Sequence, residues 1–135
     1  MIKYFKNYNK DVLSWDEIIN ELWKAVDENQ HVKQNLPAFF VTHEAHKMKK
    51  VKSILKKLKL KYAHLYISLT KNSESFGRHC DEDDVYFLLQ QGKTQWNFDD
   101  GTSIILNPGD LIYVPKKIYH EVISLTPRAG LSMSA

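Results

Sequence analysis

The stretch GRHCDEDDVYFLLQQGKTQW (residues 77–96) joins a charged loop to an apolar segment, and it indicates the fold. Its first half places a histidine, a cysteine and four acidic residues at positions 79–84, and its second half is typical of a buried strand. Other short apolar or alternating runs are separated by turn residues such as Asp-Gly and Asn-Pro-Gly. Many short strands with tight turns predict a small β-sandwich or barrel. The expected strands are 62–70, 85–90, 93–98, 103–106, 110–114, 120–124 and 129–134.

The first part of the sequence has a helical pattern instead. Apolar residues recur at helical spacing over 14–28, and Ser14 with Glu17 has the spacing of a capping box, so we expect a helix there. A short apolar run predicts a strand over 36–41. Because the strands follow later in the chain, this first part is expected to pack on the outside of the barrel.

A second helix is expected over 43–58, with Thr42 as its cap. Its many lysines could contact nucleic acid or an acidic partner, but a solvated helix face explains them more simply, so we do not expect nucleic-acid binding. His43 and His46 lie three positions apart on this helix. No acid follows them at the spacing of a zinc site, so we interpret them as surface histidines.

Length and composition favour a single soluble domain. The chain has 135 residues and a net charge of +3, which is mild. It has one cysteine, no apolar run typical of a signal peptide and none long enough for a membrane span, so we expect a cytoplasmic protein without a membrane partner. We predict one domain over 1–135, with a helical segment over 1–61 packed on a β core over 62–135.

Three residues have the chemistry and spacing of a metal site. His79 and Asp81 are two positions apart, so on extended backbone their side chains point to the same face, while Cys80 points away. His120 begins a later strand that we expect to run beside the segment carrying His79. Two histidines and one carboxylate form the facial triad that binds Fe(II) in non-haem oxygenases and leaves open positions on the metal.

The spacing of Gly109, Pro115 and His120 resembles the second motif of the cupin superfamily. In this chain Lys117 stands at the usual glycine of that motif, and Ser124 stands where asparagine is common. The first cupin motif usually has His-x-His followed by glutamate, whereas this sequence has His-x-Asp. With this His-x-Asp motif the sequence resembles the Jumonji C-type branch, the cupin-like oxygenases that depend on Fe(II) and 2-oxoglutarate.

Other segments are similar to the same branch. His79 to Asp81 is followed by an acid, an aliphatic and aromatic strand, then glutamine, glycine, a basic residue and tryptophan, as in that family. The resemblance covers about residues 62–134, and the segments that carry it are 79–81, 84–90, 92–93, Trp96, 108–115, 119–121 and 131–134.

The resemblance implies a double-stranded β-helix of eight strands, a jelly-roll barrel with Fe(II) in its mouth and 2-oxoglutarate and O₂ as co-substrates. It makes His79, Asp81 and His120 the metal ligands. Each histidine then needs a second acceptor for its other N–H, and the acids at 82–84 are candidates.

The family also implies a basic residue that pairs with the distal carboxylate of 2-oxoglutarate. The family position on the fourth strand falls on Thr94, with Lys93 one residue earlier, and Arg128 on the last strand is the alternative. The choice between Lys93 and Arg128 stays open. The candidate hydroxyl partners are Tyr66, Ser68 and Thr94.

The implied activity is therefore that of a 2-oxoglutarate-dependent dioxygenase that hydroxylates an unidentified small molecule or protein. Two alternatives stay open: a metal-binding cupin with another activity, such as a lyase, an isomerase or a 2-oxoglutarate-independent dioxygenase, and a non-catalytic cupin module. The sequence also leaves open whether the barrel pairs into a homodimer.

Overall fold

The computed structural model describes residues 1–28, 32–34, 38–70 and 76–135. Within these residues the chain forms ten strands, two α-helices and one 3₁₀-helix. The elements in chain order are β1 (Lys3–Phe5), α1 (Trp15–Asp27), β2 (Val32–Gln34), β3 (Phe39–Thr42), the 3₁₀-helix (Ala45–Lys47), α2 (Lys49–Leu58), β4 (Tyr62–Ser68), β5 (Val85–Gln91), β6 (Thr94–Phe98), β7 (Ser103–Leu106), β8 (Leu111–Val114), β9 (His120–Ser124) and β10 (Arg128–Ser134).

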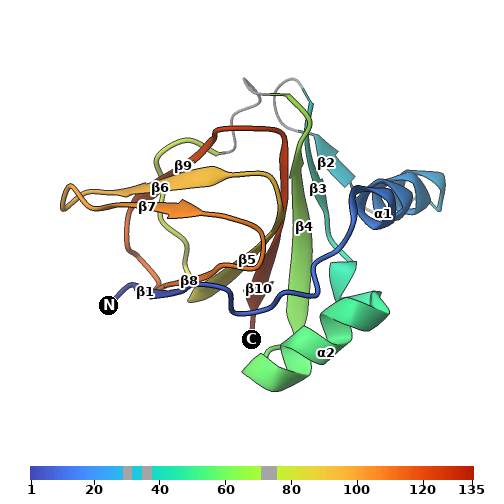
Figure 1. Cartoon of the computed structure of the whole chain (residues 1–135), viewed down its shortest axis with the longest axis horizontal. Helices are drawn as coiled ribbons and strands as arrows, with labels where there is room; N and C mark the ends of the chain where they lie inside the picture. The colour runs from blue at the N-terminus through green and yellow to red at the C-terminus, as the bar shows by residue number, and fades with distance from the viewer. Residues whose placement is uncertain (29–31, 35–37, 71–75) are drawn as a thin grey trace.

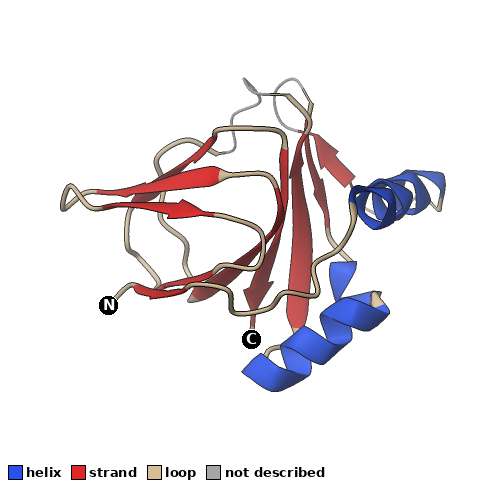
Figure 2. Cartoon of the chain, viewed as in Figure 1, coloured by secondary structure: helices blue, strands red, loops and turns tan. Residues whose placement is uncertain are grey.

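Two sheets face each other and form the barrel (Figure 1). The large sheet has seven strands in the order β1-β8-β5-β10-β4-β3-β2, and the small sheet has three in the order β7-β6-β9. Figure 2 shows both helices on the outer side of the large sheet, away from the small one. The fold is thus mainly β with helices from the first part of the chain, as the sequence predicts.

The apolar strand that follows the charged loop is buried on both of its faces. Leu88 packs in the core between the large sheet and the helices, together with Ile18 and Val51. Phe87 and Leu89 point the opposite way, into the core between the two sheets. A strand that is covered on both faces needs a continuous apolar run rather than alternating apolar and polar residues, which explains the apolar sequence of β5.

Helix α1 begins where the capping box predicts. The Ser14 side chain accepts a hydrogen bond from the Glu17 backbone N–H, and the Glu17 carboxylate accepts one from the Ser14 backbone N–H. Both bonds satisfy backbone donors that have no partner within the helix. Ile18 and Ala25 are fully buried on its inner face.

The second helix is shorter than the sequence predicts. Thr42 ends strand β3 and does not cap a helix, and α2 begins only at Lys49. Met48 breaks the helical path because its backbone is extended, with φ −70° and ψ 137°. The expected strand over 36–41 is present from Phe39, and its earlier positions lie outside the described residues.

The first part of the chain also adds strands to the barrel, which the sequence pattern did not predict for β1 and β2. β1 pairs with β8, and β3 pairs with β4, so residues before position 61 widen the large sheet at both of its edges. No helix in the described ranges is long and apolar enough to cross a membrane.

The turn before β8 fastens the N-terminal segment to the barrel. The buried Asp110 carboxylate accepts hydrogen bonds from the Tyr4 hydroxyl at 3.1 Å and from the backbone N–H groups of Asn7 and Asn107, each at 2.9 Å. Gly109 has a positive φ of 94°, and a Cβ there would lie 2.7 Å from the Asn9 carbonyl oxygen. Glycine is therefore required at this position.

Candidate metal centre

Two segments that are 41 positions apart meet at the open end of the barrel. His79 lies in the loop before β5, and His120 is the first residue of β9. Their backbones form an isolated antiparallel bridge, with N–H to O distances of 2.9 Å and 2.8 Å in the two directions. This bridge brings the two imidazoles together, with ring centroids 4.5 Å apart.

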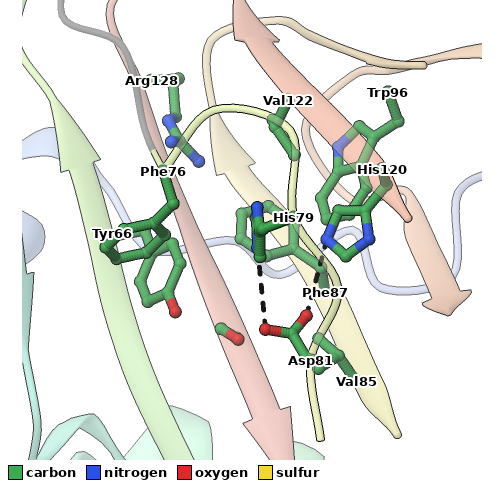
Figure 3. A pocket seen from close by; sticks show the side chains of 11 residues that line it. Tyr66, Phe76, His79, Asp81, Val85, Phe87, Trp96, His120, Val122 and Arg128 are labelled. Carbon is green, nitrogen blue, oxygen red and sulfur yellow. Dashed lines mark ion pairs between the residues drawn. The ribbon is translucent and has the colours of Figure 1, made fainter. Parts of the chain in front are cut away.

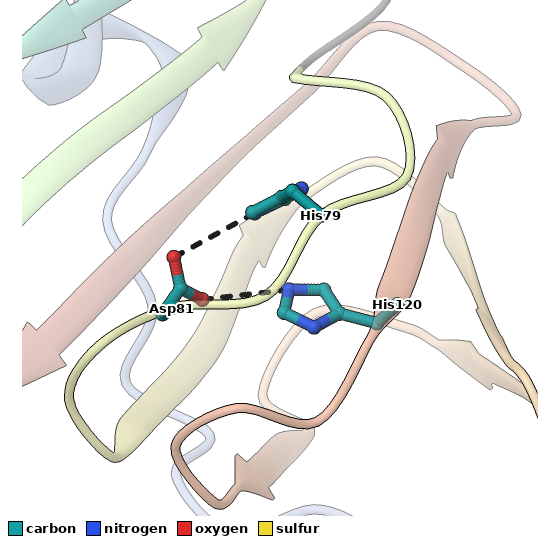
Figure 4. A group of neighbouring side chains, drawn as sticks. All are labelled: His79, Asp81 and His120. Atoms are coloured by element: carbon teal, nitrogen blue, oxygen red, sulfur yellow. Dashed lines mark ion pairs between the residues drawn. The ribbon is translucent and has the colours of Figure 1, made fainter.

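Asp81 completes the group that His79 and His120 begin (Figure 4). Its Oδ1 lies 3.7 Å from His79 Nε2, and its Oδ2 lies 3.5 Å from His120 Nε2. One ligand atom from each residue lies within 4.8 Å of the other two. Three ligands bound to one ion at about 2.0–2.2 Å cannot lie further apart than about 4.4 Å, so small side-chain movements allow them to share an ion.

Both histidines direct Nε2, the nitrogen that could bind a metal, toward Asp81. His79 Nδ1 lies 2.8 Å from the Gly77 carbonyl oxygen, and His120 Nδ1 lies 2.9 Å from the Ile118 carbonyl oxygen. Because a carbonyl only accepts, each Nδ1 carries the proton, and each Nε2 has a lone pair that faces Asp81. The acceptors are therefore backbone carbonyls, and the acids at 82–84 do not play this role. Asp84 instead accepts from the Lys116 backbone N–H at 2.8 Å.

The three side chains differ in exposure. The side chain of His120 is 4% exposed, that of His79 27% and that of Asp81 37%, so the carboxylate lies toward solvent. Burial lowers the pKa of His120 below its ordinary value of 6.5. His120 also stacks on Trp96, with ring centroids 5.4 Å apart. The buried ring is thus kept neutral, which is the form that binds a metal.

These three residues line a pocket that continues toward a buried arginine (Figure 3). Its wall is largely aromatic, and Arg128 projects into it from the start of β10. The residues that line the pocket are Tyr66, Phe76, His79, Asp81, Val85, Phe87, Trp96, His120, Val122, Arg128 and Ser132.

Arg128 is a buried cation whose Nη2 nitrogen has no hydrogen-bond partner among the described residues. Its Nε donates to the Ser68 hydroxyl at 3.0 Å, and its guanidinium lies 5.5 Å and 5.8 Å from the ring centroids of Phe39 and Phe87. Burial lowers the pKa of Arg128 to about 10, so the side chain stays charged at neutral pH. An incoming carboxylate would satisfy both the charge and the free donor.

Of the two basic residues that the sequence offers as anchors, Arg128 lines the pocket and Lys93 does not. Lys93 is exposed in the turn between β5 and β6, outside the pocket lining. Thr94 is buried but accepts from Trp96 Nε1 at 3.3 Å, and it does not line the pocket. Ser68 supports Arg128, and Tyr66 lines the pocket near it.

Two supporting positions were not identified as such from the sequence. Gly92 has a φ of 86°, and a Cβ there would lie 2.1 Å from the Pro127 carbonyl oxygen and 2.8 Å from the Arg128 Cα, so this glycine lets the backbone that carries Arg128 approach β5. Lys117 occupies the usual glycine position of the cupin motif, and its φ is 64°. Its backbone N–H donates to the Asp81 carbonyl oxygen at 2.8 Å, which fixes the loop that carries Asp81.

Comparison with known proteins supports the resemblance to cupins that the sequence indicates. Residues 65–131 match the model of the cupin domain family, whereas no curated protein sequence matches the chain. The match to the cupin domain confirms this resemblance, and the similarity to solved structures confirms the β-helix fold.

Among solved structures, the chain is similar to YcfD, a ribosomal oxygenase from Escherichia coli. The YcfD complex with cobalt and 2-oxoglutarate matches 100% of this chain with a TM-score of 0.75 and 16% sequence identity. The complex with cobalt and succinic acid matches 99% of it with a TM-score of 0.74 and 16% identity. This chain spans 48% of the YcfD chain, about half its length, and at this identity the likeness shows the fold alone.

Proposed function

We propose that this protein is an oxygenase that uses Fe(II) and 2-oxoglutarate to hydroxylate its substrate. The observation that carries the proposal is the pairing of two sites in one pocket: the His79–Asp81–His120 group and the buried, charged Arg128. A facial triad leaves open positions on the metal. A chelating 2-oxo acid fits those positions, and its distal carboxylate would pair with Arg128.

Each residue then has a defined task. His79 and His120 bind the ion through Nε2, and Asp81 supplies a charged oxygen ligand. Iron bound there would supply O₂ activation: one oxygen atom would go to succinate as 2-oxoglutarate loses CO₂, and the other would be inserted into a substrate C–H bond. The aromatic wall excludes water and therefore strengthens the attraction between Arg128 and a carboxylate.

Tyr66 lies on the same wall and has a hydrogen bond to Ser132. Burial raises its pKa above 10, so the phenol stays neutral and can donate a hydrogen bond to a bound carboxylate. The exposed side of the centre is formed by Asp81, and the substrate is expected to approach from there. We propose a small molecule or a protein side chain as the substrate, acted on in the cytoplasm.

The direct test is anaerobic addition of Fe(II) and 2-oxoglutarate to the purified protein. We expect a weak visible charge-transfer band, and succinate on exposure to air. His120→Ala should remove both signals, whereas Asp83→Asn, which neutralises an exposed neighbour of Asp81, should keep them. If metal binds but 2-oxoglutarate raises neither the band nor the melting temperature, the protein is a cupin of another activity.

A further inference from the structure

Three other histidines come together where β3 ends beside β4, outside the pocket of the metal centre. The β3–β4 ladder pairs Thr42 with Leu65, so the next residues of the two strands, His43 and His64, lie opposite each other. The third, His46, lies on the 3₁₀-helix that directly follows. The sequence interpretation of His43 and His46 as surface residues is therefore incomplete, because both rings are partly buried.

The first two rings meet through their nitrogen atoms. His43 Nδ1 lies 2.9 Å from His64 Nδ1, and the two ring planes are 89° apart. Two Nδ1 atoms at this distance cannot both carry a proton, so at least one of them presents a lone pair to the other. The observed contact is a hydrogen bond between the rings. Two nitrogens bound at about 2.0–2.1 Å to one tetrahedral ion would be about 3.3–3.4 Å apart, so a separation larger by about 0.5 Å would let both bind one ion.

His46 provides a third nitrogen nearby. Its ring packs edge-on against Tyr62, with centroids 5.8 Å apart, and Tyr62 is two residues from His64 on the same face of β4. Its Nδ1 is buried and has no hydrogen-bond partner within the described ranges. An orphaned imidazole nitrogen is costly unless a ligand can reach it.

The surroundings of His64 favour its neutral form. Burial and the neighbouring His43 and His46 lower the pKa of His64. Neutral imidazoles are the form that binds metal, and they suit zinc, copper, iron or nickel better than Mg²⁺ or Ca²⁺.

We propose that His43, His46 and His64 form a second metal site, which binds a divalent transition-metal ion such as Zn²⁺. His43 and His64 reach ligand spacing when their Nδ1 atoms separate by about 0.5 Å, and His46 completes the site by rotation of its side chain toward them. The site is separate from the first one, since none of the three histidines lines the pocket of His79, Asp81 and His120. The proposal does not depend on the proposed oxygenase activity.

The test uses protein in which the first centre is disabled. The double variant His79→Ala, His120→Ala is stripped of metal with a chelator and titrated with Zn²⁺ against a chromophoric indicator. We expect one Zn²⁺ per chain in this variant and two in the parent protein. Adding His64→Asn should remove the remaining ion, and Tyr62→Phe, which alters the same face but leaves all three imidazoles, should retain it.

His43→Asn provides an independent variant if His64→Asn does not fold, with circular dichroism as the folding control. His46→Ala should weaken Zn²⁺ binding by more than the roughly 10- to 100-fold that loss of a supporting partner costs at metal sites. Histidine side-chain NMR signals of the double variant should shift on addition of Zn²⁺ for these three residues. No binding in the double variant, or unchanged binding in folded His64→Asn and His43→Asn, would overturn the proposal.

Discussion

Replacing Arg128 by methionine tests the function of the pocket and its energetics at the same time. Methionine keeps much of the length of the side chain and can contact the Phe39 and Phe87 rings, but it removes the charge. The change should weaken binding of a dicarboxylate and should not weaken the fold. Those opposite effects separate a ligand anchor from a structural arginine.

The stability effect follows from the pKa of Arg128. A value lowered from 12.5 to about 10 means that burial disfavours the charged form by about 3 kcal/mol, and this penalty is fully present at any pH below 10. Loss of the hydrogen bond from the charged guanidinium to the Ser68 hydroxyl costs about 1.5–3 kcal/mol in the variant. The free energy of unfolding of the ligand-free protein should therefore stay the same or rise by up to about 1.5 kcal/mol.

The binding effect has the opposite sign. A hydrogen bond to a charged group contributes about 1.5–3 kcal/mol, so Arg128→Met should raise the Kd for 2-oxoglutarate by about 10- to 150-fold. 2-Oxobutanoate has the same chelating end but no distal carboxylate, so its Kd should hardly change. Lys93→Met is the matched control, because Lys93 lies outside the pocket and its loss should leave both affinities unchanged.

Two measurements decide the matter: urea unfolding of the ligand-free protein, and calorimetric titration with each acid in the presence of an inert divalent metal. The reasoning is refuted if Arg128→Met is destabilised by more than about 1 kcal/mol while the Kd for 2-oxoglutarate stays within a factor of two. That result would make Arg128 a packing residue and would remove the main support for 2-oxoglutarate.

Three further outcomes are expected. Lys117→Gly should raise the free energy of unfolding by about 0.5–1 kcal/mol, because its positive φ strains a residue with a Cβ, and Lys117→Ala should give no such gain in the same urea experiment. Gly92→Ala should lower it by about 2–4 kcal/mol, since the added Cβ would clash with the Pro127 carbonyl and the φ is positive; a fully stable variant would contradict the contact. The metal-free protein should lose stability as the pH falls below about 6.5, because the unfolded chain then takes up a proton that the buried His120 resists, and His120→Gln should flatten the slope of melting temperature against pH.

The sequence was sufficient to predict the residues that the structure brings together. Two-residue spacing on extended backbone places His79 and Asp81 on one face, and the turn and strand pattern places His120 beside them. The first signal is local, and His120 is predicted from its place at the start of a strand and from the resemblance to the second cupin motif. The signal for α1 is also local, because the capping box marks its first turn.

The parts that could not be predicted depend on contacts between distant segments. Whether Lys93 or Arg128 enters the pocket depends on the path of the turn at Gly92, which a one-residue difference in register would reverse. β1 is only three residues long and is a strand because β8 lies beside it. The expected helix start at 43 is wrong because the extended backbone of Met48 separates the short 3₁₀-helix from α2, which begins at Lys49.

The bridge between His79 and His120 also has a mechanical meaning. β9 belongs to the small sheet, whereas the loop of His79 leads into β5 of the large sheet. An ion bound by His79 and His120 would therefore cross-link the two sheets. Metal binding and the packing of the two sheets would then be thermodynamically coupled. Removing the metal would weaken the contact between the sheets, and a partner that separates the sheets would lower the affinity for the metal.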